Sequence, residues 1–185
     1  MNAEQKIILL AVLGGIAWYV YENEPQVQSA VQVGTAQVTA AVAGWKNAGS
    51  GPTWVPVLNQ AEVQYGLPTD MLAAIAFVES SFAEANIRGL APSSDGLSLG
   101  IMQLTIANYP SLVGPNVPVP YTDQNVEDQI TEAASVLSAN FSVLNSWEAT
   151  IASYNQGLTG VVNNGITSTA YVQKVIGIAP AAAVS

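Results

Sequence analysis

Helical spacing of apolar residues dominates the chain between Thr53 and Gly177, and this spacing most strongly limits the fold. Apolar side chains three or four residues apart share one face of a helix. The spacing predicts helices over 54–65, 68–82, 126–144, 147–155 and 170–176. Residues 83–100 are rich in Asn, Pro, Ser, Asp and Gly, a composition typical of loops. No convincing alternation of apolar and polar residues marks a strand, so we expect a mainly α domain over 53–178.

Charged residues are few and mostly acidic. They make up 9% of the chain, against roughly 25% in an ordinary soluble domain. Thirteen acidic and 4 basic residues give a net charge of −9, which argues against nucleic acid as a partner. The chain contains no cysteine and no histidine, which excludes thiol nucleophiles, Ser-His-Asp catalysis and zinc sites built on those residues. Any enzymatic chemistry must therefore run on carboxylates, hydroxyls, amides or the few lysines, and we expect no metal or organic cofactor.

A mostly apolar run from Ile7 to Tyr21 precedes the helical domain, between Lys6 and Glu22. As a helix it would span roughly 22 Å, and snorkelling and aromatic flanks extend it toward the roughly 30 Å of a bilayer core. We predict a membrane-anchor helix within residues 1–25, with the rest of the chain on the extracytoplasmic side. A cleaved signal peptide and a buried hydrophobic helix in a larger assembly are the alternatives.

Residues 26–52 have a different composition from both neighbours. Small apolar residues and Trp45 recur at heptad spacing over 26–45 and predict a helical stalk. Three interpretations stay open for this stalk: a helix packed against a neighbour, a surface for self-association or larger assembly, or a loose spacer. Residues 47–52 are predicted to form a linker, and 179–185 a low-complexity tail.

Glu79 places an ionisable carboxylate on the apolar face of the helix predicted over 68–82. Burial of a carboxyl group disfavours its charged form and raises its pKa, as a general acid near neutral pH requires. Taken alone, this position also fits a glutamate that emerges into solvent at the helix end, or one that pairs with Arg88.

Three short motifs favour the catalytic interpretation of Glu79. They are Glu79-Ser80-Ser81-Phe82, Gly100-Ile101-Met102-Gln103-Leu104 and Ser153-Tyr154-Asn155-Gln156-Gly157. In this order they resemble the Glu-Ser, Gly-Leu-Met-Gln and Ala-Tyr-Asn motifs of lytic transglycosylases of the goose-type lysozyme superfamily. The resemblance runs from about Trp54 to Gly177, and a Tyr-Val-x-x-Val motif closes it at Tyr171 to Val175. It departs from the family at Ile101, at Ser153 and in a longer segment after Glu79.

The resemblance implies a lysozyme-like domain that cleaves peptidoglycan between N-acetylmuramic acid and N-acetylglucosamine. Glu79 would be the single acid and base, and the product would carry a 1,6-anhydro ring. The resemblance also assigns contacts with the sugar or the catalytic carboxyl to Ser80, Met102, Gln103, Tyr154 and Asn155. Structural alternatives are a helix-end contact for Ser80, core packing for Met102, and loop support for Tyr154 and Asn155.

The product and the setting have alternatives of their own. A hydrolysing lysozyme would need a second carboxylate to activate water, and Asp95 and Glu84 are the candidates. The simpler interpretation of both acids is a solvated loop charge. A third alternative is a non-catalytic structural or peptidoglycan-binding component of an envelope or viral assembly. The N-terminal segment fits a membrane-anchored envelope enzyme or an enzyme carried in a virus particle.

Overall fold

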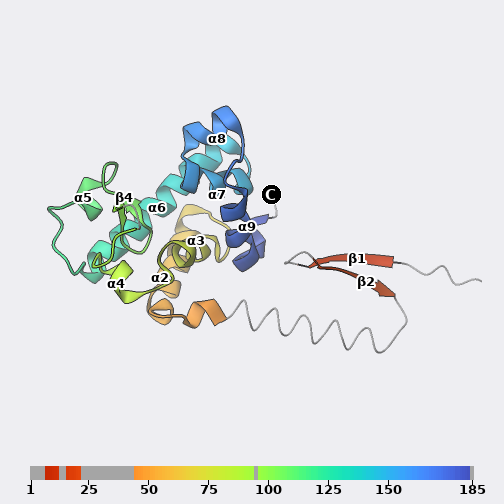
Figure 1. The fold of residues 1–185 in the computed structure, drawn as a ribbon, viewed down its shortest axis with the longest axis horizontal. Coiled ribbons are helices and arrows are strands. Elements are labelled where there is room, and N and C mark those ends of the chain that lie inside the picture. The colour runs from red at the N-terminus through yellow and green to blue at the C-terminus, as the bar shows by residue number, and fades with distance from the viewer. Residues whose placement is uncertain (1–6, 13–15, 22–43, 94–95, 184–185) are drawn as a thin grey trace, which may run out of the picture. The chain divides into compact units, whose positions relative to one another are not determined.

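The computed structural model describes residues 7–12, 16–21, 44–93 and 96–183 (Figure 1). The chain divides into two compact units, Met1–Gly44 and Trp45–Ser185. The second unit is mainly helical, as the sequence predicts, and it carries the three motifs.

The described part of the first unit is a pair of strands, β1 (Ile7–Val12) and β2 (Ile16–Tyr21). They pair antiparallel, with Ile7 opposite Tyr21. The prediction of one helix over this run is therefore wrong. Both segments are rich in β-branched and aromatic residues, which favour strands, and the sequence between them contains a Gly-Gly pair typical of hairpins. Among the described residues, no helix combines the length and apolar character needed to cross a membrane.

The start of the second unit lies earlier than the sequence predicts. Most of the predicted stalk lies outside the described residues, but Trp45 belongs to the short helix η1 (Trp45–Asn47) and is buried in the domain core. Its ring lies 5.8 Å from that of Phe77 and 6.1 Å from that of Phe82. The predicted linker packs there too, because the Ser50 N–H donates to the Phe82 carbonyl oxygen at 2.8 Å. A Cβ on Gly49 would lie 2.2 Å from that oxygen, which accounts for the glycine.

The helix α3 is the central element of the second unit (Figure 1). The longer helices are α2 (Gly51–Tyr65), α3 (Met71–Ser80), α6 (Asp123–Leu144), α7 (Trp147–Gln156) and α9 (Thr169–Ile178). α3 packs against α2 and α9, while α6 contacts α2 and α7. Every residue from Met71 to Ala76 is fully buried, so α3 is surrounded by the rest of the domain. Burial on all sides explains why the sequence of this helix is almost continuously apolar.

Side-chain caps set the boundaries of the helices that follow. Thr122 and Asn125 form a capping box at the start of α6, and Ser146 caps α7. α3 begins three residues later than predicted, because residues 68–71 form a turn and Asp70 has a left-handed backbone with φ +64°.

Several short elements were not predicted. They are α4 (Glu84–Ile87), β3 (Ser98–Leu99), β4 (Leu104–Thr105), α5 (Pro110–Val113), α8 (Leu158–Asn164) and η2 (Pro180–Ala183). β3 and β4 pair antiparallel around the Gly-x-Met-Gln motif. The predicted tail is partly packed, because Ala179 and Ala182 are buried. Elements of two to seven residues are too short to show a periodic pattern.

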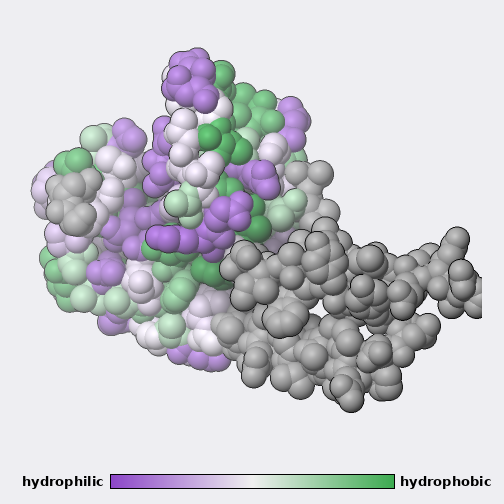
Figure 2. All heavy atoms as spheres, turned by 45° about the vertical axis from the view of Figure 1, so that its right-hand side comes forward, coloured by the Kyte–Doolittle hydropathy of each residue, from purple (hydrophilic) through white to green (hydrophobic). Residues whose placement is uncertain are grey.

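The surface of the second unit is mixed in character. Figure 2 shows one face, on which hydrophilic residues lie beside hydrophobic ones rather than covering them. Val63, at 85%, and Leu90, at 59%, are among the exposed large apolar side chains. A chain with so few charges covers its surface largely with neutral groups.

Candidate active site

Glu79 lies in the last turn of α3, where the buried helix reaches the surface of the domain. After Ser80, the backbone is left-handed at two successive residues: φ is +53° at Ser81 and +52° at Phe82. Phe82 is fully buried, so the chain turns sharply and holds the end of α3 in place. The carboxyl group of Glu79 is consequently carried on a well-packed element with its side chain partly open to the cleft.

Tyr171 on α9 is the hydrogen-bond partner of this carboxyl group. Its hydroxyl donates to Oε1 of Glu79 at 2.6 Å. Burial raises the pKa of Glu79 above its ordinary value of 4.5, and the bond from Tyr171 opposes that rise. The pairing of Glu79 with Arg88 that the sequence left open does not occur, because Arg88 pairs with Glu84 and Asp123 at 2.7 Å each. Glu79 is thus suited to hold a proton nearer neutral pH than an exposed glutamate.

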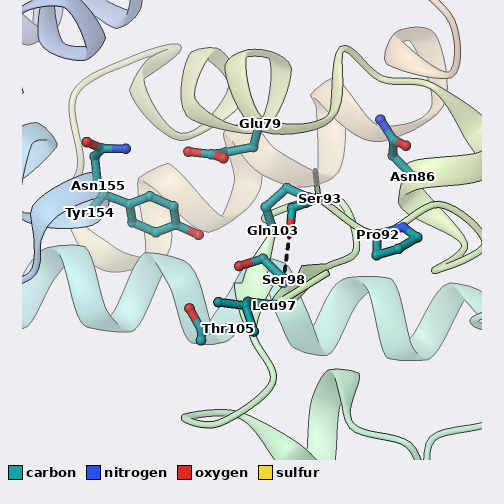
Figure 3. A pocket seen from close by; sticks show the side chains of 10 residues that line it. All are labelled: Glu79, Asn86, Pro92, Ser93, Leu97, Ser98, Gln103, Thr105, Tyr154 and Asn155. Carbon is teal, nitrogen blue, oxygen red and sulfur yellow. Dashed lines mark hydrogen bonds between the residues drawn. The ribbon is translucent and has the colours of Figure 1, made fainter. Parts of the chain in front are cut away.

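A cleft of about 610 Å³ opens beside Glu79 (Figure 3). Its lining residues are Glu79, Asn86, Pro92, Ser93, Leu97, Ser98, Gln103, Thr105, Tyr154 and Asn155. Among these, Glu79 alone carries a full charge; the others offer amides, hydroxyls or apolar surface. In Figure 3, Tyr154 and Asn155 lie together at one end of the cleft, and Asn86 and Pro92 lie at the other. Neutral hydrogen-bonding groups of this kind suit a carbohydrate.

The turn between β3 and β4 brings Gln103 into the cleft. Gln103 has φ +47°, an uncommon conformation for a residue with a side chain, and its Nε2 donates to the Gly100 carbonyl oxygen at 2.9 Å. Gly100 has φ +84°, and a Cβ there would lie 1.9 Å from Oε1 of the buried Gln129. The backbone conformation therefore favours glycine at this position, and an added Cβ would also displace the end of the Gln129 side chain.

Tyr154 joins α7 to this turn. Its hydroxyl donates to the Met102 carbonyl oxygen at 2.7 Å. A second pocket of about 240 Å³ lies next to the first and shares Gln103, Thr105 and Tyr154 with it. Tyr109 and Asn140 are among the further residues that line this second pocket. The two adjoining pockets together are called the groove below.

A single partly buried carboxyl group in a neutral groove is suited to protonating a glycosidic oxygen. The family model of the Transglycosylase SLT domain matches residues 56–174, from within α2 to within α9. The chain belongs to this family. It is a peptidoglycan-cleaving lytic transglycosylase of the lysozyme-like superfamily. A comparison with curated proteins finds no match.

Four of the six site residues predicted for this transglycosylase line the cleft: Glu79, Gln103, Tyr154 and Asn155. Ser80 and Met102 do not reach it, because both side chains are fully buried. The Ser80 hydroxyl donates to the Ala76 carbonyl oxygen at 2.7 Å and accepts from the Phe82 N–H at 3.2 Å. Ser80 thus stabilises the end of α3, and Met102 fills the core, which were the structural alternatives for these two residues.

The sequence interpretation missed the hydrogen-bond partner of Glu79, the candidate acid of the transglycosylase. Tyr154 was expected to bond near the Glu79 carboxyl, but Tyr171 makes that bond. The available signal was the closing Tyr-Val-x-x-Val motif, which begins at Tyr171. The lining residues Asn86, Ser93 and Ser98 were also missed, because residues 83–100 showed only a loop composition. Thr105 was missed as well, because it follows the second motif and is not part of it.

The sequence offered Glu84 and Asp95 as candidates for a second catalytic carboxylate. Glu84 pairs with Ser50 and Arg88, which lower its pKa, and it is not among the residues that line either pocket. Asp95 lies outside the described residues. Within the described ranges, no group of three or more acidic residues lies close enough to hold a metal ion.

Proposed function

We propose that Glu79 cleaves the β-1,4 bond between N-acetylmuramic acid and N-acetylglucosamine by intramolecular transglycosylation. The protonated carboxyl group donates its proton to the glycosidic oxygen as the bond to the muramic anomeric carbon breaks. The resulting carboxylate then takes the proton of the muramic 6-hydroxyl. That oxygen bonds to the anomeric carbon and closes a 1,6-anhydro ring, so Glu79 ends protonated and no water is consumed.

The placement of Glu79 is the observation that carries this proposal. It is the one carboxyl side chain among the described residues that line the cleft, and its raised pKa favours the protonated form that begins the reaction. Most glycosidases use two carboxylates at a defined separation. One suffices here if the acetamido group of the substrate shields the positive charge that develops at the anomeric carbon.

Gln103 and Asn155 are the amides best placed to hold the sugar. Both line the cleft, and Asn155 is exposed at the end where Tyr154 lies (Figure 3). Amide side chains offer both a donor and an acceptor, which match sugar hydroxyl and acetamido groups. We expect them to orient the ring so that the glycosidic oxygen meets the Glu79 carboxyl group.

Mass spectrometry of the fragments released from purified sacculi tests the reaction. The intact protein should release anhydro-muropeptides, and Glu79→Gln should release at least about a thousandfold fewer, since the amide cannot donate the proton. Reducing ends that carry added water, and that vanish in Glu79→Gln, would replace transglycosylation by hydrolysis. A folded protein that releases neither product would support the structural or binding alternative.

The setting of the enzyme is a separate proposal. We infer action on the extracytoplasmic side of a membrane, through attachment by residues 7–21, or delivery of the enzyme in a virus particle. The apolar composition of this run supports attachment or assembly. Extraction of the membrane fraction tests attachment. We expect the protein to stay with the membranes through a high-salt wash and to be released by detergent. Release by mild salt alone would contradict membrane attachment.

A further inference from the structure

The positive charges of the domain are largely neutralised by its own acids. The chain has 13 acidic and 4 basic residues. Lys46 contacts Asp70 at 2.6 Å, and Arg88 contacts Glu84 and Asp123 at 2.7 Å each. Lys174 is exposed on α9 and is not among the residues that line either pocket. The described part of the domain therefore carries more negative than positive charge, and the resulting field repels anions.

The groove itself is neutral apart from Glu79. Side chains along its described parts present amides, hydroxyls and apolar groups, which match uncharged sugar rings. Glu132 adds negative charge near the second pocket, because it lies on α6 one helical turn before Val136, which lines that pocket. Burial, and after it the charge of Glu132, raises the pKa of Tyr109 in the same pocket. Such a groove offers no compensation for carboxylates carried by a bound substrate.

Peptidoglycan presents this problem because each stem peptide carries free carboxylates close to the glycan. Like charges within a Debye length, about 8 Å at physiological salt, repel each other and slow association. Amidation of a stem carboxylate removes the charge but leaves the sugar, which the neutral groove can still bind. We propose that this transglycosylase selects glycan with neutralised stem carboxylates over glycan with ionised stems. The inference rests on the proposed function, since it concerns the substrate of the same site.

A single batch of sacculi supplies the matched substrates. One half is treated with carbodiimide and excess ammonium, which converts carboxylates to primary amides; the other half is left untreated. At about 20 mM salt, anhydro ends should form about 3–10 times faster on the amidated half. At about 0.5 M salt, where the Debye length falls to roughly 4 Å, the two rates should differ less than twofold.

The outcomes separate this inference from the proposed function. Equal rates on both substrates at low salt, or faster cleavage of the ionised half, would overturn the selection while leaving the transglycosylase activity in place. Absence of anhydro ends from both halves at every salt concentration would overturn the proposed function and the selection with it.

A pair of variants with the same change of net charge tests where the selection arises. Glu132→Gln removes a charge beside the second pocket, whereas Glu148→Gln removes one at the opposite end of α7 from Asn155. We expect the ratio of rates on amidated and ionised sacculi to fall about twofold in Glu132→Gln and to stay near the wild-type value in Glu148→Gln. An unchanged ratio in Glu132→Gln would contradict selection by charge at the groove.

Discussion

The hydroxyl oxygen of Tyr171 lies 2.6 Å from Oε1 of Glu79, and this bond joins α9 to the last turn of α3. The two residues are 92 positions apart in the chain. The phenol holds the carboxyl group in one orientation at the edge of the cleft. Because the phenol donates a hydrogen bond to the carboxylate, it also stabilises the charged form of Glu79 against the effect of burial.

Replacement of Tyr171 by phenylalanine should alter the pH dependence of the reaction. The general acid must be protonated, so activity is lost as pH rises through the pKa of Glu79. Loss of the Tyr171 bond raises that pKa further, and the high-pH limb of kcat/KM should move to higher pH. We also expect kcat/KM to fall about tenfold because the carboxyl group loses its orientation.

A matched control for this variant is Tyr65→Phe on α2, which removes a hydroxyl outside the cleft. Rates of anhydro-end release across a pH series measure both variants. If the high-pH limb of kcat/KM in Tyr171→Phe stays at its wild-type position, the hydrogen bond from Tyr171 does not affect the pKa of Glu79.

Tyr154→Phe should affect the groove without moving the pH profile. The change leaves the carbonyl oxygen of Met102 without its donor, and a buried unsatisfied acceptor costs about 1–3 kcal/mol. Urea denaturation should show that loss, and KM should rise because the turn that carries Gln103 is less well held. A variant as stable as the wild type would mean that another donor, such as water, replaces the phenol.

Glu62 should make the stability of the domain depend on pH. Its side chain on α2 is 2% exposed and accepts the N–H groups of Asp70 and Ala73 at 2.7 and 3.1 Å, so it caps the start of α3. Burial raises its pKa to about 7 from 4.5, against the opposing effect of the N–H groups. Because the folded pKa is the higher, its stabilisation is complete below pH 4.5 and is lost as pH rises through about 7.

The free energy of unfolding at about pH 5 and about pH 8 measures this effect, which amounts to about 3 kcal/mol at most. Glu62→Gln cannot ionise and should show a smaller difference between the two pH values. Glu148→Gln, an exposed change of the same kind on α7, should retain the wild-type difference. Equal pH dependence in Glu62→Gln and the wild type would show that Glu62 does not titrate in this range.

Gly100→Ala should disrupt the turn that presents Gln103. The added Cβ would lie 1.9 Å from Oε1 of Gln129, and the backbone has φ +84°. We expect a loss of about 2 kcal/mol or more in stability and a marked fall in activity. In Gln129→Ala/Gly100→Ala the steric contact is removed but the backbone strain stays, so stability should be restored only in part. Full restoration would assign the whole cost to the contact.

Local pattern in the sequence was sufficient for the long helices. The predictions at 54–65, 126–144 and 147–155 agree with α2, α6 and α7 to within three residues, because helical periodicity is expressed within a dozen neighbouring positions. The same reasoning failed at Ile7 to Tyr21, where a continuous apolar run fits a helix and a pair of strands equally well. It also missed α4, α5 and α8, which are too short for a periodic signal.

The features of the site also divide into those that the sequence motifs indicate and those that tertiary packing decides. The proposed acid, Glu79, and three further cleft residues, Gln103, Tyr154 and Asn155, were selected from motifs that are contiguous in the chain, and all four line the cleft. Packing alone decides that Tyr171 bonds Glu79, that Tyr154 bonds Met102 across 52 positions, and that Ser80 is buried. A motif specifies which residues stand together in the chain, whereas a hydrogen bond depends on which distant surfaces the folded core brings within 3 Å.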